Sequence, residues 1–545
     1  MSGAGLLLVA TLVVPIGMLL TCLSRRVRER MPAFLVLAPL PALAAALLAA
    51  GGPPLVLDEA RRQFTLALDA PGAILLGVAA LLWSAAGLYA RTYIGEGPAG
   101  GRFSEWWLLT LTGSLGVFIA ADLVSFYVTF ALVSLAAWGL VIHDATARAR
   151  RAGVIYLALA VFGEICLLMG FALLAAATPG DSWAIEGGVA MLPASPWRGL
   201  TLAFLIAGFG LKMGLVPLHV WLPVAHPAAP MPASAVLSGA IIKAGVLGLI
   251  RFLPFEGALP NWGVTLTAVG LLTAFYGVAL GITQANPKTV LAYSSVSQMG
   301  LVAAVLGMAL AAGDGGAATA AAFYAAHHVL AKGALFLAVG VVAASGARRL
   351  WQVLLPAAVL ALGFGGLPLT GGGLAKLAVT PLLGEGIVGL LATLAAAGST
   401  LLMLHFLHRL RLASTPDPEA SAPAELARPW LALAFAAVAV PWAFFLAMGV
   451  GSLAEAFAPT DLWKGLWPVL LGAVLALGLR RFGHRLPSIP EGDVVVVGER
   501  LSRASVAFGA SLERGEGVLR QWPVAGISLL ALTVILGAAV LGNLD

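Results

Sequence analysis

Charged side chains are scarce in this chain. Asp, Glu, Lys and Arg make up 10% of its 545 residues, hydrophobic residues make up 60%, and the mean hydropathy is +0.98. A soluble domain carries about 25% charged residues, so this composition excludes an ordinary water-facing surface. The apolar runs reach the roughly 20 residues that a helix needs to cross a bilayer core of about 30 Å. The sequence therefore predicts an all-α polytopic membrane protein.

Cysteine is also rare. Cys22 and Cys166 both lie in apolar runs, which is typical of packing residues and excludes a disulfide framework or a zinc site built on cysteines. Neither a glycine-rich dinucleotide fingerprint nor a phosphate loop is found in the sequence. We therefore expect no cofactor and no metal in this chain. The net charge of +6 does not indicate nucleic acid, because most basic residues lie between apolar runs, where they orient a membrane protein.

The apolar windows predict roughly sixteen membrane spans. Their centres are Val14, Leu43, Gly77, Leu111, Val133, Leu168, Ile206, Leu247, Leu271, Val302, Leu335, Leu360, Leu401, Phe435, Val474 and Leu532. The run from Gly5 to Leu23 resembles a signal peptide, but its arginines follow it, so we expect a retained first helix.

Nearly all basic residues follow odd-numbered spans, which places them on one side of the membrane. By the positive-inside rule that side is the cytoplasm, and both termini are then periplasmic in a bacterial inner membrane. The exceptions are Arg61, Arg62, Arg198 and Arg251.

Two glycine- and proline-rich stretches interrupt apolar spans. One runs from Gly214 through Pro223 to Pro232, and the other from Gly365 to Gly373. Irregular backbone survives at membrane depth only where it is buried in protein or lines a wet cavity. A matching pair of broken helices indicates inverted repeats in a transporter. The alternative reading is a pair of ordinary proline kinks.

Four of the six lysines interrupt apolar spans, in a chain that has 25 arginines. These are Lys212, Lys243, Lys332 and Lys376. Each charged lysine at mid-membrane costs about 2.5–3.5 kcal/mol on insertion scales. A buried lysine can release its proton near neutral pH, whereas arginine cannot, so a proton path requires lysine. We interpret the four as proton-path residues. Lys288 lies at a helix entrance.

Histidine and glutamate extend this set. His328 and Lys332 are four residues apart on one helix face, so they can form a relay pair. Glu164 interrupts an apolar run and is expected to partner a lysine, first of all Lys212. His219 and His226 flank the first break and are pathway candidates, while His327 is equally consistent with an interior histidine. Asp122 and Asp144 lie near span ends, where we expect them to be solvated.

Four motifs make the chain resemble the antiporter-like subunits of respiratory complex I, of Mrp-type cation/proton antiporters and of membrane-bound hydrogenases. They lie at Lys212–Pro223, Ala233–Ala240, Pro287–Gly300 and His328–Phe336. The resemblance implies a core of fourteen helices with two inverted five-helix repeats, each containing a broken helix. The apolar windows add about two C-terminal helices beyond this core. It implies a division into N-terminal helices (1–104), first repeat (105–255), second repeat (256–412) and C-terminal helices with a cytoplasmic connector (413–545).

The resemblance also implies roles for the buried residues. Lys212 matches the first-channel lysine, Lys243 the lysine one helix later, Lys332 the central lysine and Lys376 the second-channel residue, and His328 matches the histidine before the central lysine. One departure is Ala131, where the family usually has a glutamate that pairs with the first lysine. Glu164 matches a position that is often acidic and is the expected substitute.

The sequence thus predicts a proton- or sodium-translocating subunit of a larger membrane complex in a lipid bilayer, with other membrane subunits as partners. A peripheral redox subunit would carry any oxidoreductase chemistry. A second reading is a gradient-consuming subunit coupled to a soluble zinc enzyme for inorganic carbon uptake, and a third is a non-conducting structural subunit. The segments Gly498–Arg503 and Leu512–Gln521 are expected to form a short amphipathic helix, a docking element or a solvated connector.

Overall fold

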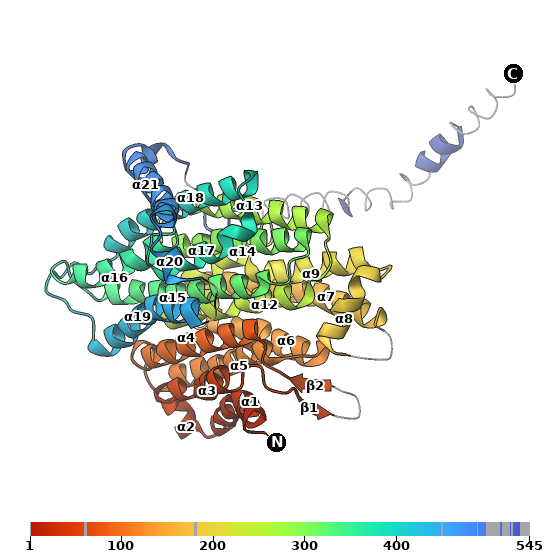
Figure 1. Cartoon of the computed structure of the whole chain (residues 1–545), viewed down its shortest axis with the longest axis horizontal. Helices are drawn as coiled ribbons and strands as arrows, with labels where there is room; N and C mark the ends of the chain where they lie inside the picture. Colours follow the sequence, from red (N-terminus) through yellow and green to blue (C-terminus); the bar gives the residue numbers. More distant parts are fainter. Residues whose placement is uncertain are drawn as a thin grey trace. The chain divides into compact units, whose positions relative to one another are not determined.

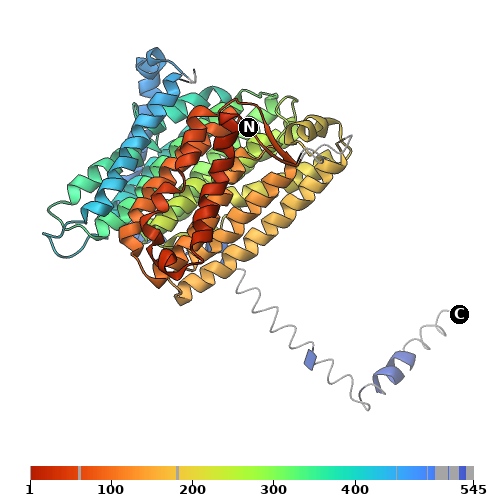
Figure 2. The same cartoon turned by 90° about the horizontal axis from the view of Figure 1, so that it is seen from below.

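The computed structural model describes residues 2–58, 63–178, 183–447, 449, 451–487, 489–496, 513, 514, 524 and 527–534. The chain divides into two units, residues 1–491 and 492–545. Figures 1 and 2 show that most helices of the first unit lie side by side with nearly parallel axes. In the second unit the described residues are helical at 493–496 and 527–534. The predicted connector helix falls outside the described residues, apart from Glu513 and Arg514.

The first unit is built from helices with one small hairpin. Its N-terminal half comprises α1 (Gly3–Thr21), α2 (Arg25–Arg30), η1 (Met31–Ala33), η2 (Leu35–Leu37), α3 (Leu40–Leu48), β1 (Leu55–Asp58), β2 (Gln63–Leu66), α4 (Ala70–Ile94), α5 (Pro98–Ile119), α6 (Leu123–Val141), α7 (Ala147–Ala176), α8 (Ile185–Met191), η4 (Leu192–Ala194), α9 (Arg198–Met213), α10 (Trp221–Ala228), α11 (Met231–Val236), the π-helical η5 (Leu237–Ile241) and α12 (Lys243–Phe252). Its second half comprises α13 (Pro260–Gly281), α14 (Pro287–Ala312), α15 (Ala317–Ala343), α16 (Leu350–Gly363), α17 (Gly371–Leu383), α18 (Ile387–Arg411), α19 (Ala424–Ala447), α20 (Leu453–Ala456), α21 (Pro459–Phe482) and η6 (Gly483–Arg485).

Among the described residues, eleven helices are long and apolar enough to cross a membrane, or twelve if the bent pair Arg25–Ala33 and Leu35–Leu48 is one span. The prediction of an all-α polytopic membrane protein is confirmed, and all predicted span centres fall in helical segments. The predicted totals of fourteen core helices and sixteen spans remain predictions. Several predicted spans, such as those around Ile206 and Leu360, are short helices that end at a break.

Both predicted breaks are present. Helix α9 ends at Met213 and is capped by Gly214 at φ 84°, a left-handed conformation that glycine adopts without strain, and α10 begins at Trp221. The first break is therefore shorter than the sequence suggested, because the chain is helical again across Pro223. Helix α16 ends at Gly363 and α17 begins at Gly371, where the Thr370 side chain accepts a hydrogen bond from the Gly373 N–H.

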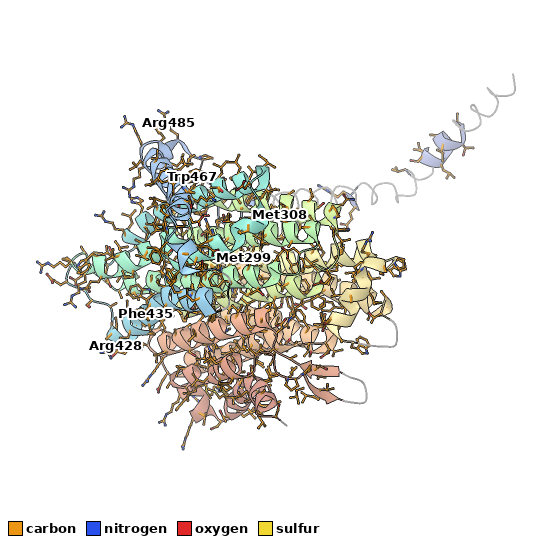
Figure 3. All side chains as sticks on the ribbon, in the orientation of Figure 1. Met299, Met308, Arg428, Phe435, Trp467 and Arg485 are labelled. Atoms are coloured by element: carbon orange, nitrogen blue, oxygen red, sulfur yellow. The ribbon has the colours of Figure 1, made fainter. Side chains whose placement is uncertain are left out.

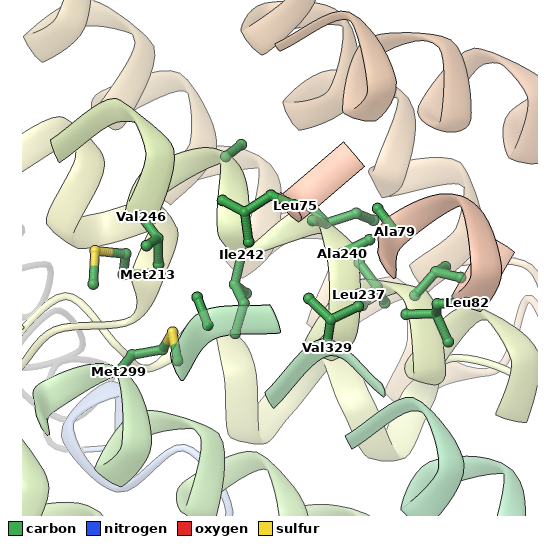
Figure 4. Packing of buried hydrophobic residues seen from close by; sticks show 14 of the residues in the cluster. Leu75, Ala79, Leu82, Met213, Leu237, Ala240, Ile242, Val246, Met299 and Val329 are labelled. Atoms are coloured by element: carbon green, nitrogen blue, oxygen red, sulfur yellow. The ribbon is translucent and has the colours of Figure 1, made fainter. Parts of the chain in front are cut away.

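The most enclosed spans carry the central lysines. A stretch of 18 residues in the span Met231–Phe252, and another in α15, is fully buried within the protein. Figure 4 shows the apolar packing beside them, with Leu82 of α4 next to Leu237 and Val329. A Cβ added to Gly239 or Gly333 would come within 2.3 Å of the Leu82 side chain, so both glycines are needed for this close approach. By contrast, Arg428 is exposed at the surface, whereas Met299 is buried (Figure 3).

Two antiparallel strands, not foreseen in the sequence, lie next to α6. Strands β1 and β2 pair with Leu55 opposite Leu66. The Asp122 carboxylate accepts hydrogen bonds from the backbone N–H groups of Thr65, Val124 and Ser125. The expectation that Asp122 is solvated is wrong, because it caps α6 and is 1% exposed. Asp144 is exposed, as expected.

Arg251, an exception to the charge pattern, is held at the end of α12 by Asp69. Its guanidinium donates to the Asp69 carboxylate at 2.7 Å and to the carbonyls of Val117, Phe118 and Ala120. The positive charge is therefore locally compensated. Arg198 donates to the Pro193 carbonyl, and Arg61 and Arg62 fall outside the described residues.

Asp69 should make stability depend on pH. Burial alone would raise its pKa, but the attraction of Arg251 and hydrogen bonds from Arg251 and Gly72 outweigh burial and hold the pKa below its ordinary value. A carboxylate with a lowered folded-state pKa stabilises the fold above its ordinary value of about 4 and loses that contribution as pH falls below it. We expect Asp69→Asn to lower the melting temperature of the detergent-solubilised protein at pH 7. The difference in melting temperature between this variant and the wild type should become smaller below about pH 4. A gap that stays constant from pH 7 to pH 3 would contradict this role.

Candidate functional site: a buried chain of lysines and histidines

Lys212 lies in the last turn of α9, directly before the first break, and is 4% exposed. Its Nζ donates a hydrogen bond to Ser134 Oγ of α6 at 2.9 Å. Ser134 lies three residues after Ala131 on α6, so both side chains are on the same side of that helix. A hydroxyl on α6 therefore contacts Lys212, although Ala131 supplies no carboxylate one turn earlier. The aromatic rings of Phe130 and Tyr156 lie 5.6 and 5.9 Å from Nζ, within the range of cation–π attraction.

Glu164 of α7 lines the same small cavity as Lys212. This cavity has a volume of about 10 Å³, close to the minimum for one water molecule. Its polar lining consists of Ser134, Tyr156, Glu164, Lys212 and Trp221. Neither carboxylate oxygen has a hydrogen-bond partner among the described residues, and no ion pair within 4 Å joins Glu164 to Lys212 there. The two predicted partners therefore share a pocket without direct contact.

Lys243 and His328 are in direct contact at the centre of the protein. Lys243 begins α12, one residue after the π-helical turn Leu237–Ile241, and π-helical turns often occur at functional sites. Its Nζ lies 2.6 Å from His328 Nδ1 of α15 and 3.3 Å from the Ser238 carbonyl oxygen. Both side chains are 0% exposed. The sequence paired His328 with Lys332; in the structure the hydrogen-bonded partner of His328 is Lys243, because α12 packs directly against α15.

Lys332 lies one turn beyond His328 on α15. Its Nζ donates to the Leu291 carbonyl of α14 at 3.0 Å and lies 4.8 Å from the centre of the Phe364 ring. Phe364 directly follows α16, and its ring also lies 5.6 Å from His328 and 5.3 Å from His327. The Phe364 ring therefore packs near Lys332, while the backbone of Phe364 begins the second break.

Lys376 lies in α17, after the second break. Its stem packs against Gly366, where an added Cβ would approach Lys376 Cδ to 3.0 Å. The Nζ atom is buried and has no hydrogen-bond partner among the described residues. His327 approaches the same helix, since its Nδ1 would lie 2.9 Å from a Cβ on Gly371. His327 therefore lies beside the second break.

Further polar side chains join this region that the sequence did not single out individually. Tyr324 Oη donates to Gln298 Oε1 at 2.5 Å, and Gln298 Nε2 donates to Ser399 Oγ at 2.9 Å, which links α15, α14 and α18. Lys288, expected at a helix entrance, is 6% exposed and donates to the Ala229 carbonyl. The sequence contains one signal that could have identified such residues, which is the density of polar side chains in the apolar run of α14.

The two histidines beside the first break are both buried. His226 is in α10, its ring lies 4.7 Å from that of Phe336, and both of its ring nitrogens lack a hydrogen-bond partner among the described residues. His219 lies 4.9 Å from Tyr276. In the part of the chain that the structure describes, no three His, Cys, Asp or Glu side chains are grouped to hold a metal ion.

The arrangement is a series of titratable groups enclosed by apolar packing. A proton can pass between nitrogens in hydrogen-bond contact, such as Lys243 and His328, and a charge at one site changes the free energy of charge at its neighbours in a low dielectric. The site residues predicted from the sequence therefore lie on helices that pack next to one another.

Residues 120–401 match a family model described as NADH:quinone oxidoreductase/Mrp antiporter, transmembrane. The matched region contains all the site residues above.

Among curated proteins, the chain is 38% identical over 274 residues to an uncharacterized protein of Mycobacterium tuberculosis (46% of this chain, 42% of that protein). It is 30% identical over 297 residues to hydrogenase-4 component B of Escherichia coli (51% and 43%). It is 31% identical over 304 residues to Na(+)/H(+) antiporter subunit A1 of Staphylococcus aureus (53% and 37%). These matches span less than half the length of each curated relative.

Two solved structures share the fold. One is a chain of the Mrp complex from Dietzia sp., with a TM-score of 0.76, 24% identity, and coverage of 100% of this chain and 63% of that chain. The other belongs to the membrane-bound sulfane sulfur reductase, an archaeal respiratory membrane complex, with a TM-score of 0.68, 22% identity, and coverage of 98% and 100%.

Proposed function

Since this chain belongs to the NADH:quinone oxidoreductase/Mrp antiporter transmembrane family, we propose that it translocates protons, alone or in exchange for sodium ions, as one subunit of a larger membrane complex. The family relation and the multiple apolar helices make it an integral, multi-pass membrane protein of the antiporter-like type.

The observation that carries the proposal is the contact between Lys243 and His328. Two titratable nitrogens lie 2.6 Å apart, and both side chains are 0% exposed. An unpaired charge there is costly, and neither residue can reach an aqueous surface. A buried lysine–histidine contact of this kind supports proton transfer better than it supports packing, which an apolar pair would satisfy at lower cost.

The two breaks supply a route to this centre from either side. Lys212 and Glu164 lie beside the first break, and Lys376 lies beside the second. We propose that each end exchanges protons through water in the adjoining half-channel. Protonation of one lysine then changes the proton affinity of the next by Coulomb coupling, so the groups titrate together.

The proposed setting is a bacterial inner membrane with both termini on the periplasmic side. The basic ends of α18 and α21, which carry Arg409, Arg411, Arg480 and Arg481, would face the cytoplasm. The two solved structures named above belong to multisubunit membrane complexes. This supports the proposal that the chain has other membrane subunits as partners. Any redox chemistry would belong to such a partner.

We expect Glu164→Gln to lower cation flux about tenfold, the factor that corresponds to losing about 1.4 kcal/mol of charge interaction with Lys212. Glutamine keeps the volume of the side chain but cannot carry a proton or a negative charge. The native complex, reconstituted in proteoliposomes with a pH-sensitive and a sodium-sensitive dye, reports both ions separately.

Glu256→Gln is the matched control, because Glu256 is exposed and lies outside the lysine series. Equal flux for wild type and Glu164→Gln would remove Glu164 from the path. A wild-type complex that moves neither ion would contradict the proposed function itself.

A further inference from the structure

A second, larger cavity lies between the last turns of α18 and α21 and the loop after α13. Its volume is about 790 Å³, within the range of roughly 300–1,000 Å³ that small-molecule sites occupy. Five basic side chains line it: His405, His408, Arg409, Arg411 and Arg480. This cavity is separate from the buried lysine series and has no role in the proposed ion path.

These basic side chains lie close enough to act electrostatically on one another. The charged groups that act on His408 are Arg480, Arg409 and Arg411, and none of the described residues that line the cavity is Asp or Glu. Basic residues in the last turn of a single helix can simply complement its dipole. Here, however, side chains from two helices converge on one hollow, which leaves like charges facing each other unless an anion lies between them.

Two of the basic groups are held in place by backbone carbonyls. His405 Nε2 lies 2.8 Å from the Gln284 carbonyl oxygen, and Arg409 Nε donates to the Ala285 carbonyl at 2.7 Å. The Arg409 bond uses Nε, so the terminal nitrogens of its guanidinium can still bind an anion. Arg411 and Arg480 are exposed at the rim, where they can close on a ligand.

The remaining walls are apolar, which distinguishes this cavity from a site for a small free anion. Ile282, Leu404, Ala476, Leu479 and Leu486 line it. On α21, the exposed residues Leu470, Val474 and Leu477 lead along the helix toward Arg480. A basic cluster that follows a lipid-exposed apolar face lies at the height of the lipid headgroups.

We propose that this cavity binds the phosphate headgroup of an anionic phospholipid, with an acyl chain along the apolar wall. The guanidinium groups of Arg409, Arg411 and Arg480 would bind the phosphate oxygens through charge-assisted hydrogen bonds. The recognised chemistry is a phosphate ester, and the adjoining apolar wall selects its lipid form over inorganic phosphate.

Native mass spectrometry of the purified protein with its native partners, exchanged into nanodiscs of phosphatidylglycerol and phosphatidylcholine, tests the site. We expect the wild type to retain phosphatidylglycerol on release from the nanodisc, and Arg411→Gln with Arg480→Gln to lower that retention about tenfold, for about 1.4 kcal/mol lost. Arg428→Gln, which changes an exposed arginine outside the cavity, is the matched control and should change nothing.

Three results would overturn the proposal. Equal retention by wild type and the double variant would show that the cavity is not the site. Equal retention of phosphatidylcholine would remove the requirement for an anionic headgroup. Full thermal protection by inorganic phosphate alone, lost in the double variant, would assign the cavity to a free anion. A single change at Arg480, which is exposed, guards against misfolding of the double variant.

Discussion

Replacing Lys332 with alanine is expected to reduce ion translocation about 100-fold or more, the scale on which a positioned proton-transfer group contributes to a reaction. Lys332 is 0% exposed in the buried stretch Ala321–Val342 of α15, one turn from His328 and 4.8 Å from the Phe364 ring that borders the second break. Removing its amine takes a titratable group of α15 out of the series between the Lys243–His328 contact and the second break. Flux is measured in proteoliposomes that contain the native complex.

Two further substitutions separate loss of the proton site from loss of structure. Lys332→Met keeps most of the side-chain volume without the amine and should be as inactive as alanine. Lys332→Arg keeps the positive charge but cannot release its proton at any relevant pH, so it should also be inactive. Lys464→Ala is the control, because the Lys464 side chain is 65% exposed. Its Nζ lies 3.9 Å from Asp461, at the outer limit of an ion pair. Wild-type flux in Lys332→Arg would mean that a fixed charge suffices, which contradicts proton transfer through this residue.

Gly270→Ala should strongly destabilise the protein although it adds a single methyl group. Helices α13 and α14 pack closely along their length through Gly263, Gly270 and Gly277. A Cβ on Gly270 would lie 2.5 Å from both the Ala304 nitrogen and the Gly300 oxygen, which are backbone atoms and cannot turn aside. Small residues at membrane helix contacts allow such approach. We expect a loss of about 1–3 kcal/mol or more, as for other overpacked interiors.

The matched control is Gly17→Ala in α1, where an added Cβ meets nothing within 4 Å. Because alanine favours helix over glycine by about 0.5–1 kcal/mol, this change should be neutral or stabilising. Melting temperatures of both variants in the same detergent give the comparison. Equal melting temperatures for the two variants would mean that α13 and α14 do not pack as closely as described.

The lysine series shows how much of the site could be read from the sequence. Lys212, Lys243, Lys332 and Lys376 stood out because each interrupts an apolar run, and the cost of charge in a membrane makes such residues rare. Lys288 was not singled out, because its position near a helix start is equally typical of an interfacial lysine. Only the packing of its side chain toward Ala229 places it inside the protein.

Contacts between helices could not be predicted, because they depend on how distant segments pack. Periodicity correctly placed His328 and Lys332 on one face of α15, yet the hydrogen-bonded partner of His328 is Lys243, 85 residues earlier. In the same way Ser134, rather than a carboxylate, contacts Lys212, and Glu164 lies in the same cavity without an ion pair.

The sequence by itself determined that the chain is a helical membrane protein, where two of its helices are broken, and which residues carry costly buried charge. These properties are local: they follow from hydrophobicity, from glycine and proline, and from the free energy of burying a single side chain. Only the tertiary structure decided which of these groups touch, that Asp122 is a buried cap, and that the arginines of α18 and α21 face one cavity. Those relations arise from helix packing over long sequence separations, on which the residues of a single segment carry no information.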